Sequence, residues 1–497
     1  MALGTIPDDI RVPLVYIDID NSQALSGAPA QSRKIIVIGQ QSATGTAAVL
    51  TQNRITSDGT ADQLYGKGSM LAGMLKTLRH ANSYTELWAM GLEDLTAGAA
   101  AKAELAITGP AAAAGTLALL VNGVSVQVGV SAEATADAVA ASVIAAVNKL
   151  PDTQVTAALK AESTADVTLT ANWKGATANA MDVRLNYYTG EQTPAGVEVA
   201  LTTFAGGTGT PDIAAVVAAL GDDWYTDIVF PFNDTQSLNT IRDELLTRWG
   251  PLKMIEAQLW TAFRGTHAES GTFGDARNDW LISCIGTNIA PQPHWLWAAS
   301  YGGIAAYYLA NDPARPLQTL VLPGILPPGK TVRWDMQERN LLLHDGIATH
   351  YADASDNVCI EREITMYRVN QFGDADTSYL DVQSPATLGR IRYVIKNRFT
   401  NRYPRHKLAG DDVLELLEPG QPVMTPKIAR AELLDIALTE LIPAGLVEDF
   451  DDYKDTLGGL SRRQRQEPPE LHLPSEPGKP AAHSGRSHPV QTLRSTA

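Results

Sequence analysis

The chain has 497 residues, of which 44% are hydrophobic, and its formal net charge is -16. This length allows several domains with large cores, and the acidity argues against indiscriminate binding to nucleic acid. The two isolated cysteines, Cys284 and Cys359, fit neither a disulfide framework nor a zinc site, so we expect a reducing compartment.

The sequence gives no sign of export or of a membrane span. Its first residues, MALGTIPDDIRV, lack the basic start and apolar centre of a signal peptide. The most Ala-rich stretch, residues 97–121, contains Lys102, Glu104 and Pro110, which a span would not carry. Direct insertion into a membrane is therefore not expected.

Residues 1–33 are predicted to form an extended arm. A strand pattern of period two is followed by a loose run rich in Ser, Gln, Gly and Ala. Such a tether would let the strand leave its own domain, which raises the question of what the strand pairs with. The predicted strand consists of Val15, Tyr16, Ile17, Asp18 and Ile19.

Residues 34–95 predict the first part of an α/β core. KIIVIGQ is a continuous apolar run, as in a strand buried on both faces. GSMLAGMLKTLRHA carries a helical apolar stripe, and YTELWAMGL is a second buried strand. This strand, helix and strand form a βαβ unit, which favours a parallel or mixed sheet.

The composition shifts towards Ala, Thr, Val and Gly between residues 96 and 209. TLALLVNGVSVQVGV carries a hairpin signal at Asn122-Gly123, and TADAVAASVIAAVNKL predicts a helix. ADVTLTANW and VEVALTTFAGG are read as further strands. We interpret 96–209 as an α+β module, rich in strands, inserted into the first domain.

Residues 210–457 predict the second part of the core. WYTDIVFPF, MIEAQLW, DWLISCIGTNI and CIEREITMY are candidate strands, and Asp234 is a candidate helix cap. WLWAASYGGIAAYYLAND predicts a helix whose small residues allow close packing, and a long helix is expected near 427. Residues 458–497 lack aromatic residues and are rich in Pro and Arg, a composition that predicts disorder. The predicted fold class is therefore α/β with a mixed sheet, an inserted α+β module and extended terminal arms.

No pattern in the chain predicts a catalytic, cofactor-binding or metal site. GQQSATGTA, with Gly39 and Gly45, lacks the lysine of a phosphate loop and is better read as an ordinary turn from strand to helix. THAES, with His267 and Glu269, resembles half of a deaminase motif, but the downstream cysteines are absent, so we expect a polar loop. His80, His344 and His350 are isolated and are read as surface or core histidines. The acidic run at 448–452 lacks the glycine and glutamate of a Ca²⁺ loop, and we read it as a solvated or partner-facing patch.

One basic segment stands out between Asp381 and Asp411. The segment predicts an amphipathic helix, in which one face is apolar and the other face is basic and available for contacts. This face could be solvated near acidic neighbours of the same fold, dock an acidic partner protein, or bind nucleic acid, of which the last is weakest. For the second alternative, the candidate residues are Arg390, Arg392, Lys396 and Arg398.

A long collinear set of segments resembles the tail sheath proteins of contractile-tailed phages, specifically the Mu-like group. The set runs from about residue 5 to residue 457, and no single segment in it would suffice. The segments are IPDDIRVPLVYIDIDNS, YTELWA, RWGPLKMIEAQ, DPARPLQTLVLPGILPP, ERNLLLHDGIATH, IEREITMY, DADTSYLDVQSPATLGRIRY, YPRHKLAGD, TPKIARAELL and GLVEDFDDYKDTL.

The resemblance implies a structural role in the virion tail. It implies hexameric rings stacked helically around a tail tube protein, contacts with baseplate and tail terminator proteins, and contraction that drives the tube through the host envelope for genome ejection. It also implies terminal arms that add strands to neighbouring copies, assembly in the host cytoplasm, an outward-projecting module at 96–209, and neither cofactor nor nucleic acid. The basic helix would then face the tube.

The resemblance fails from Gly458, where relatives continue with a charged stretch and apolar strands. We hypothesise that a reading-frame change or a degraded prophage copy replaced the ending, which translation of the other frames past codon 457 would test. Two alternatives remain open at this point. One is an α/β enzyme that binds a phosphate-containing ligand at the Gly39 turn, and the other is a β-rich surface adhesin.

Overall fold

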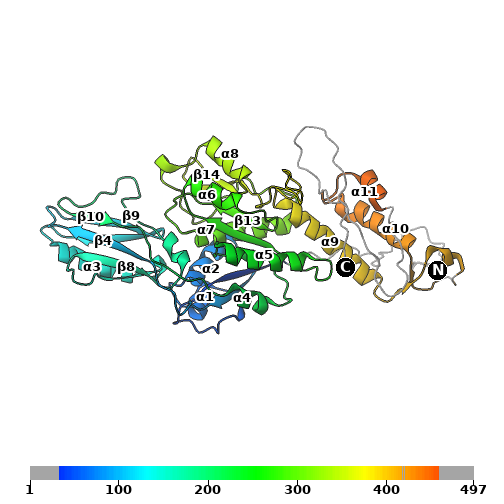
Figure 1. Ribbon diagram of the computed structural model, residues 1–497, viewed down its shortest axis with the longest axis horizontal. Coiled ribbons are helices and arrows are strands. Elements are labelled where there is room, and N and C mark those ends of the chain that lie inside the picture. The colour runs from blue at the N-terminus through cyan, green and yellow to red at the C-terminus, as the bar shows by residue number, and fades with distance from the viewer. Residues whose placement is uncertain (1–32, 417, 419, 458–497) are drawn as a thin grey trace, which may run out of the picture. The chain divides into compact units, whose positions relative to one another are not determined.

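The computed structural model describes residues 33–416, 418 and 420–457 (Figure 1). Residues 33–386 form one compact unit, and the described residues from 387 onward belong to a second unit. The predicted arm strand, Val15–Ile19, and the tail 458–497 lie outside the described residues. The mixed α/β class predicted from the sequence is confirmed.

A six-stranded sheet forms the centre of the unit 33–386, in the order β13-β12-β11-β1-β3-β2. Neighbouring strands run parallel, except that β2 is antiparallel to β3. Both faces of such a sheet must be covered, which explains apolar runs such as residues 35–38. The strands are β1 Lys34–Gln40, β2 Gln52–Arg54, β3 Glu86–Leu92, β11 Asp227–Val229, β12 Gln258–Phe263 and β13 Ile282–Gly286.

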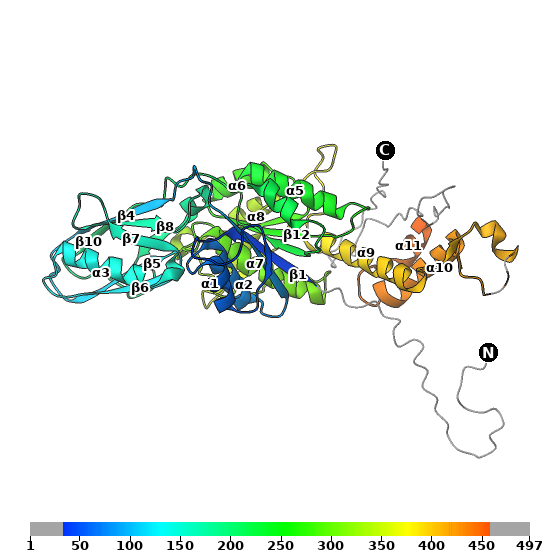
Figure 2. The ribbon, with the colours of Figure 1, turned by 90° about the horizontal axis from the view of Figure 1, so that it is seen from below.

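Helices cover the two faces of this sheet, and Figure 2 shows α2 and α5 on opposite sides of it. Alternate residues of β1 face different layers: Ile35 and Val37 pack with α2 and α7, whereas Ile36 and Ile38 pack with α4 and α5. This alternation follows from the period of two along a strand. The helices are α2 Met70–Ala81, α4 Ile213–Leu220, α5 Thr235–Trp249 and α7 His294–Asn311.

Capping and small residues position these helices as the sequence predicts. Asp234 caps α5 by accepting the Ser237 amide at 3.0 Å. Gly302 allows α7 to approach the sheet closely, because a Cβ at this position would lie 2.7 Å from the Val229 side chain. The predicted close packing of this helix is therefore confirmed.

The segment after β1 differs from its prediction. Residues 41–51 do not lead into a helix but into β2, which pairs with β3, and the short helix α1, Asp58–Tyr65, follows only afterwards. The prediction of a direct turn from strand to helix was wrong, because antiparallel pairing with a distant strand outweighed the local pattern.

Two smaller sheets and one α-helix follow β3 and precede α4 along the chain, and they form the left-hand part of the ribbon in Figure 1. The expected hairpin is confirmed: Asn122 and Gly123 have φ values of 51° and 83°, as a two-residue turn of this kind requires. All these elements belong to the compact unit 33–386, and the module limits 96 and 209 stay a prediction. The sheets are β10-β4-β8-β7 and β6-β5-β9, with β4 Lys102–Thr108, β5 Gly115–Val121, β6 Val124–Val130, α3 Ala136–Asn148, β7 Val155–Leu159, β8 Asp166–Ala171, β9 Val183–Leu185 and β10 Glu198–Leu201.

The rest of this unit contains α6 His267–Asp275, α8 Met336–His344, and the antiparallel pair β14 Thr349–Ala352 and β15 Val358–Arg362. The helix α9, Gln383–Arg402, begins here and continues into the second unit. In the second unit β16, Lys407–Leu408, pairs in parallel with β17, Val423–Met424. The helices α10, Pro426–Ile436, and α11, Phe450–Thr456, follow, separated by a π-helical turn at Ala437–Leu441. None of the helices in the described ranges is both long and apolar enough to cross a membrane.

Candidate functional site

The carboxyl ends of the parallel strands are the place where doubly wound sheets usually bind ligands. In this chain the module that follows β3 returns over that edge. Gln40, at the end of β1, is fully buried, and its Nε2 donates to Asp94 Oδ1 at 2.8 Å and to the Lys174 carbonyl at 2.6 Å. The edge beside β1 is therefore occupied by the chain itself.

A buried ion-pair cluster closes the same edge beyond β12. One Asp182 oxygen accepts from Arg264 Nη2 at 2.7 Å, and the other accepts from Arg184 Nε at 2.6 Å. Arg264 also donates to the Ala290 carbonyl at 2.9 Å, and its side chain and that of Asp182 are each only 15% exposed. Burial lowers the pKa of Arg264, and the neighbouring Asp182 carboxylate counteracts this effect. The sequence did not point to these residues, which lie up to 82 positions apart.

Packing accounts for one of the two glycines in the suggested phosphate loop. A Cβ on Gly39 would meet Leu71 and Met74 at 3.4 Å, and a Cβ on Gly45 would lie 2.5 Å from the Leu64 carbonyl oxygen. The Gly45 contact involves backbone, which cannot move aside easily. Close approach of two chain segments therefore accounts for Gly45 without a ligand.

His267 and Glu269 lie at the beginning of α6, so the prediction of a polar loop was wrong. Glu269 forms a capping box with Thr266, whose amide donates to Glu269 Oε2 at 2.8 Å. This backbone hydrogen bond lowers the pKa of Glu269. Within 33–416, 418 and 420–457, no three His, Cys, Asp or Glu side chains gather as metal ligands would.

The isolated histidines and cysteines take structural positions. His80 and His344 are exposed, whereas His350 is buried beside Trp297, with ring centroids 4.8 Å apart. Burial lowers the pKa of His350 to about 4, and the same holds for buried His294, whose Nε2 lies 2.8 Å from the Pro231 carbonyl oxygen. The thiols of both cysteines are free and buried.

The basic residues of α9 make different kinds of contact. Arg398 pairs within its own unit with Glu432 at 2.9 Å, with Asp435 at 3.0 Å and with Glu440. Its side chain is only 13% exposed, so this guanidinium fixes α9 to α10 and to the turn behind it. Arg390 lies over the Tyr393 ring at 5.5 Å, and Arg392 and Lys396 lie on the same helix.

The two-stranded sheet β16–β17 has an edge at Leu408 that pairs with no further strand among the described residues. Lys407 and Ala409 donate their amides to Pro422 and Met424, so the intervening Leu408 directs its N–H and C=O away from β17. Leu408 is 53% exposed, and among the described residues neither strand has a second partner. Unpaired strand edges of this kind are templates for another strand.

The predicted acidic patch surrounds the beginning of α11. Asp449 caps this helix by accepting the Asp452 amide at 3.0 Å, and Asp451 and Asp452 are exposed in its first turn. Acidic residues in the first turn of a helix interact favourably with the helix dipole, which gives the patch a structural role.

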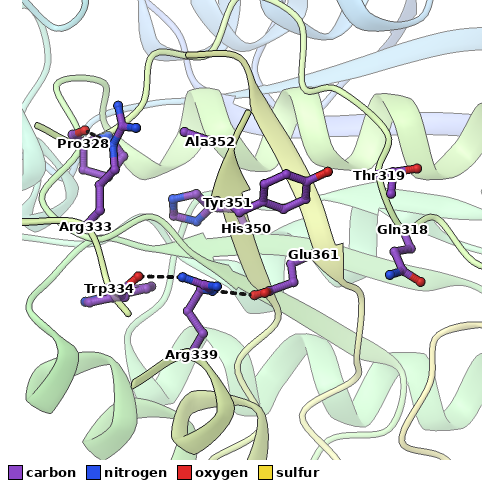
Figure 3. Close-up of a pocket in the computed structure, with 10 residues that line it drawn as sticks. All are labelled: Gln318, Thr319, Pro328, Arg333, Trp334, Arg339, His350, Tyr351, Ala352 and Glu361. Carbon is purple, nitrogen blue, oxygen red and sulfur yellow. Dashed lines mark hydrogen bonds and ion pairs between the residues drawn. The ribbon is translucent and has the colours of Figure 1, made fainter. Parts of the chain in front are cut away.

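A cavity of about 500 Å³ lies beside β14 and β15 (Figure 3). Arg339 lies between Trp334 and Glu361, donating to the Trp334 carbonyl and to a Glu361 oxygen at 2.8 Å. Sequence reasoning missed this cavity, because its walls come from segments more than 30 positions apart. The lining residues are Gln318, Thr319, Pro328, Arg333, Trp334, Arg339, His350, Tyr351, Ala352 and Glu361.

Comparison with known proteins places the chain in a family. Residues 206–366 match the phage tail sheath protein central domain. Sheath tail proteins from Desulfitobacterium hafniense and Listeria innocua give TM-scores of 0.44 and 0.42 at 12% and 10% identity, over 88% and 89% of this chain and 91% and 89% of theirs. The Mu-like prophage FluMu tail sheath protein of Haemophilus influenzae is 44% identical over 457 residues, 92% of each chain. On this similarity, the chain belongs to the family of Mu-like phage tail sheath proteins.

Proposed function

We propose that this chain acts as a structural subunit of a contractile tail sheath and not as an enzyme. Its copies polymerise as stacked hexameric rings around a tail tube, between a baseplate and a tail terminator, after synthesis in the host cytoplasm. Contraction then drives the tube through the host envelope. The observation that carries the proposal is the open edge at Leu408, which suits strand addition by another copy.

The predicted strand Val15–Ile19 supplies the missing partner. Strand addition uses main-chain hydrogen bonds, which tolerate changes of side chain and survive tilting of the bodies that they join. Each bond is worth roughly 1 kcal/mol net, so about five bonds give a modest link that repeats through the lattice. Residues 21–33 act as the tether that lets copies rotate without separating.

Contraction on this proposal needs no nucleotide. An extended lattice relaxes to a compact one with more buried contact, and a few kcal/mol per copy add up over many copies. The filled edge at Gln40 supports this role, because the place where the enzyme alternative needs a ligand is occupied by Asp94 and Lys174.

Two further surfaces are assigned by the same proposal. The module 96–209 projects outward, away from the tube. The middle of α9, with Arg390, Arg392 and Lys396, faces an acidic tube surface, while Arg398 holds this helix against α10. Reversing Arg392 and Lys396 to Glu should weaken co-assembly with the tube while rings still form. Unchanged co-assembly would count against this surface.

Negative-stain microscopy of the purified full chain tests the assembly. We expect hollow tubes from the parent chain, and only small particles from Ile17→Pro, which removes one main-chain donor from the arm strand. The matched control, Ile17→Val, keeps the donor and should form tubes. Undiminished tubes from Ile17→Pro, with unchanged circular dichroism, would refute strand exchange.

A further inference from the structure

The cavity beside β14 and β15 carries a local positive charge on an acidic chain. Two arginines, Arg333 and Arg339, line the cavity together with one carboxylate, Glu361. Asp356 is shared between Lys330 at 3.2 Å and Arg333 at 2.9 Å. Among the residues that line the cavity, cations therefore outnumber carboxylates by one, whereas the whole chain carries a net charge of -16.

Both arginines keep free donors at the cavity. Arg333 uses Nε on the Pro328 carbonyl and Nη2 on Asp356, and Arg339 uses Nε on Glu361 and Nη1 on the Trp334 carbonyl. Within the described part of the chain, Nη1 of Arg333 and Nη2 of Arg339 make no hydrogen bond. Each guanidinium can thus donate to one more carboxylate in its fork geometry.

Exposed apolar side chains lie close in sequence to several residues that line the cavity. Val332 directly precedes Arg333 and is 40% exposed, and Met336 lies two positions after Trp334 and is 74% exposed. Val321 lies two positions after the lining residue Thr319 and is 41% exposed. A ligand that matches this surface therefore combines adjacent carboxylates with apolar groups on either side.

Charge selects one segment of the chain as the occupant. Residues 1–32 contain four aspartates against one arginine, whereas residues 458–497 contain six Lys or Arg against three glutamates. Asp8 and Asp9 are the only adjacent carboxylates in residues 1–32, and Ile6 and Ile10 flank them. The charge of the acidic arm therefore matches the arginines of the cavity, and that of the basic tail does not.

The arm can span a long distance when it is extended. Asp9 lies 24 positions before Arg33, a stretch that spans roughly 80 Å when extended. Val15–Ile19 lie beyond Ile10 and stay available for strand addition. An anchor at Asp8-Asp9 would add side-chain specificity and register to main-chain bonds that carry little of either.

We propose that the cavity lined by Arg333, Trp334 and Arg339 binds residues Ile6–Ile10 of the arm of a neighbouring copy, with Asp8 and Asp9 paired to the two guanidinium groups. This inference rests on the proposed arm exchange and deepens it, because it identifies a second contact made by the same arm.

Photo-crosslinking tests the contact in the assembled full chain. p-Benzoylphenylalanine replaces Ile10, and tubes are formed from equal amounts of ¹⁴N-labelled and ¹⁵N-labelled copies. We expect crosslinks from position 10 to residues 318–361, in pairs that mix the two isotopes. Crosslinks only to other regions, or only within one copy, would overturn the inference. p-Benzoylphenylalanine at Gln31, close to the point where the arm joins its own copy, is the control probe.

Charge-neutral variants separate this contact from strand exchange. Asp8→Asn with Asp9→Asn should lower the crosslink yield roughly tenfold, the value of one charge-assisted hydrogen bond, while Asp18→Asn should not. Tubes with an unchanged yield would refute the anchor and leave strand exchange standing. Loss of tubes in Ile17→Pro bears on strand exchange and not on the anchor. Absent crosslinks count against the anchor only if the chain that carries the Ile10 probe still forms tubes.

A binding assay covers the case in which the probe prevents assembly. A fluorescein-labelled peptide of residues 4–14 is titrated into the unassembled full chain and followed by polarisation. We expect binding that is roughly tenfold tighter than for the same peptide with Asn at both aspartates, and lost in Arg333→Gln with Arg339→Gln. Equal binding of the two peptides would overturn the inference.

Discussion

Replacing Asp182 by Asn should destabilise the unit 33–386 strongly. Asp182 accepts from Arg264 at 2.7 Å and from Arg184 at 2.6 Å, and it is only 15% exposed. The amide keeps the volume of the side chain but removes the charge, which leaves the buried Arg264 without compensation. Removing one partner of a buried pair costs about 3–5 kcal/mol, so we expect a loss of this size in the free energy of unfolding.

A matched surface pair provides the control. Glu104 and Lys160 are also 2.7 Å apart, but they are 42% and 43% exposed. Glu104→Gln makes the same chemical change, and exposed pairs are worth at most about 1 kcal/mol. Urea unfolding of both full-length variants at pH 7, followed by tryptophan fluorescence, measures the difference. Equal shifts of the two midpoints would refute the claim that the Asp182 cluster fastens the module to the sheet.

Two further predictions concern the interior of the same unit. His294 and His350 have pKa values of about 4 in the folded chain against about 6.5 when unfolded, so the unfolded state binds more protons between these values, and stability should fall as the pH drops from 6.5 to 4. His350→Gln should reduce the slope of the free energy of unfolding against pH by about 1.4 kcal/mol per pH unit near pH 5. If the urea midpoints of parent and variant change identically with pH, titration of His350 is excluded as the cause. Gly45→Ala should lower the thermal midpoint clearly, because its Cβ would lie 2.5 Å from a carbonyl oxygen, whereas Gly129→Ala, with nothing within 4 Å, should not. Equal midpoints for the two alanine variants would contradict the packing argument.

Local patterns predicted the elements whose signals are local. The apolar run of β1, the stripe of α2 and the Asp234 cap all depend on residues within a few positions of one another. The hairpin at Asn122-Gly123 is a signal of the same kind, because both residues must adopt positive φ. These elements were predicted from the sequence and are confirmed.

The missed features depend on distant partners. β2 exists because it pairs with β3, and Asp182 meets Arg264 across 82 positions. Arg398 looked like part of a free basic face, but its acidic partners lie 34 or more positions away on α10 and the following turn. The beginning of α6 carried a readable signal, the spacing of Thr266 and Glu269, although its weak apolar stripe concealed the helix. Charge and periodicity locate such residues, but only the fold brings them together.

A cryo-EM map of tubes assembled from the full chain tests the central claim most directly. The account predicts that the backbone of Val15–Ile19 continues the β16–β17 sheet of a neighbouring copy and follows an unbroken connection to its own Arg33. An arm strand paired within its own copy in an intact tube would contradict the account.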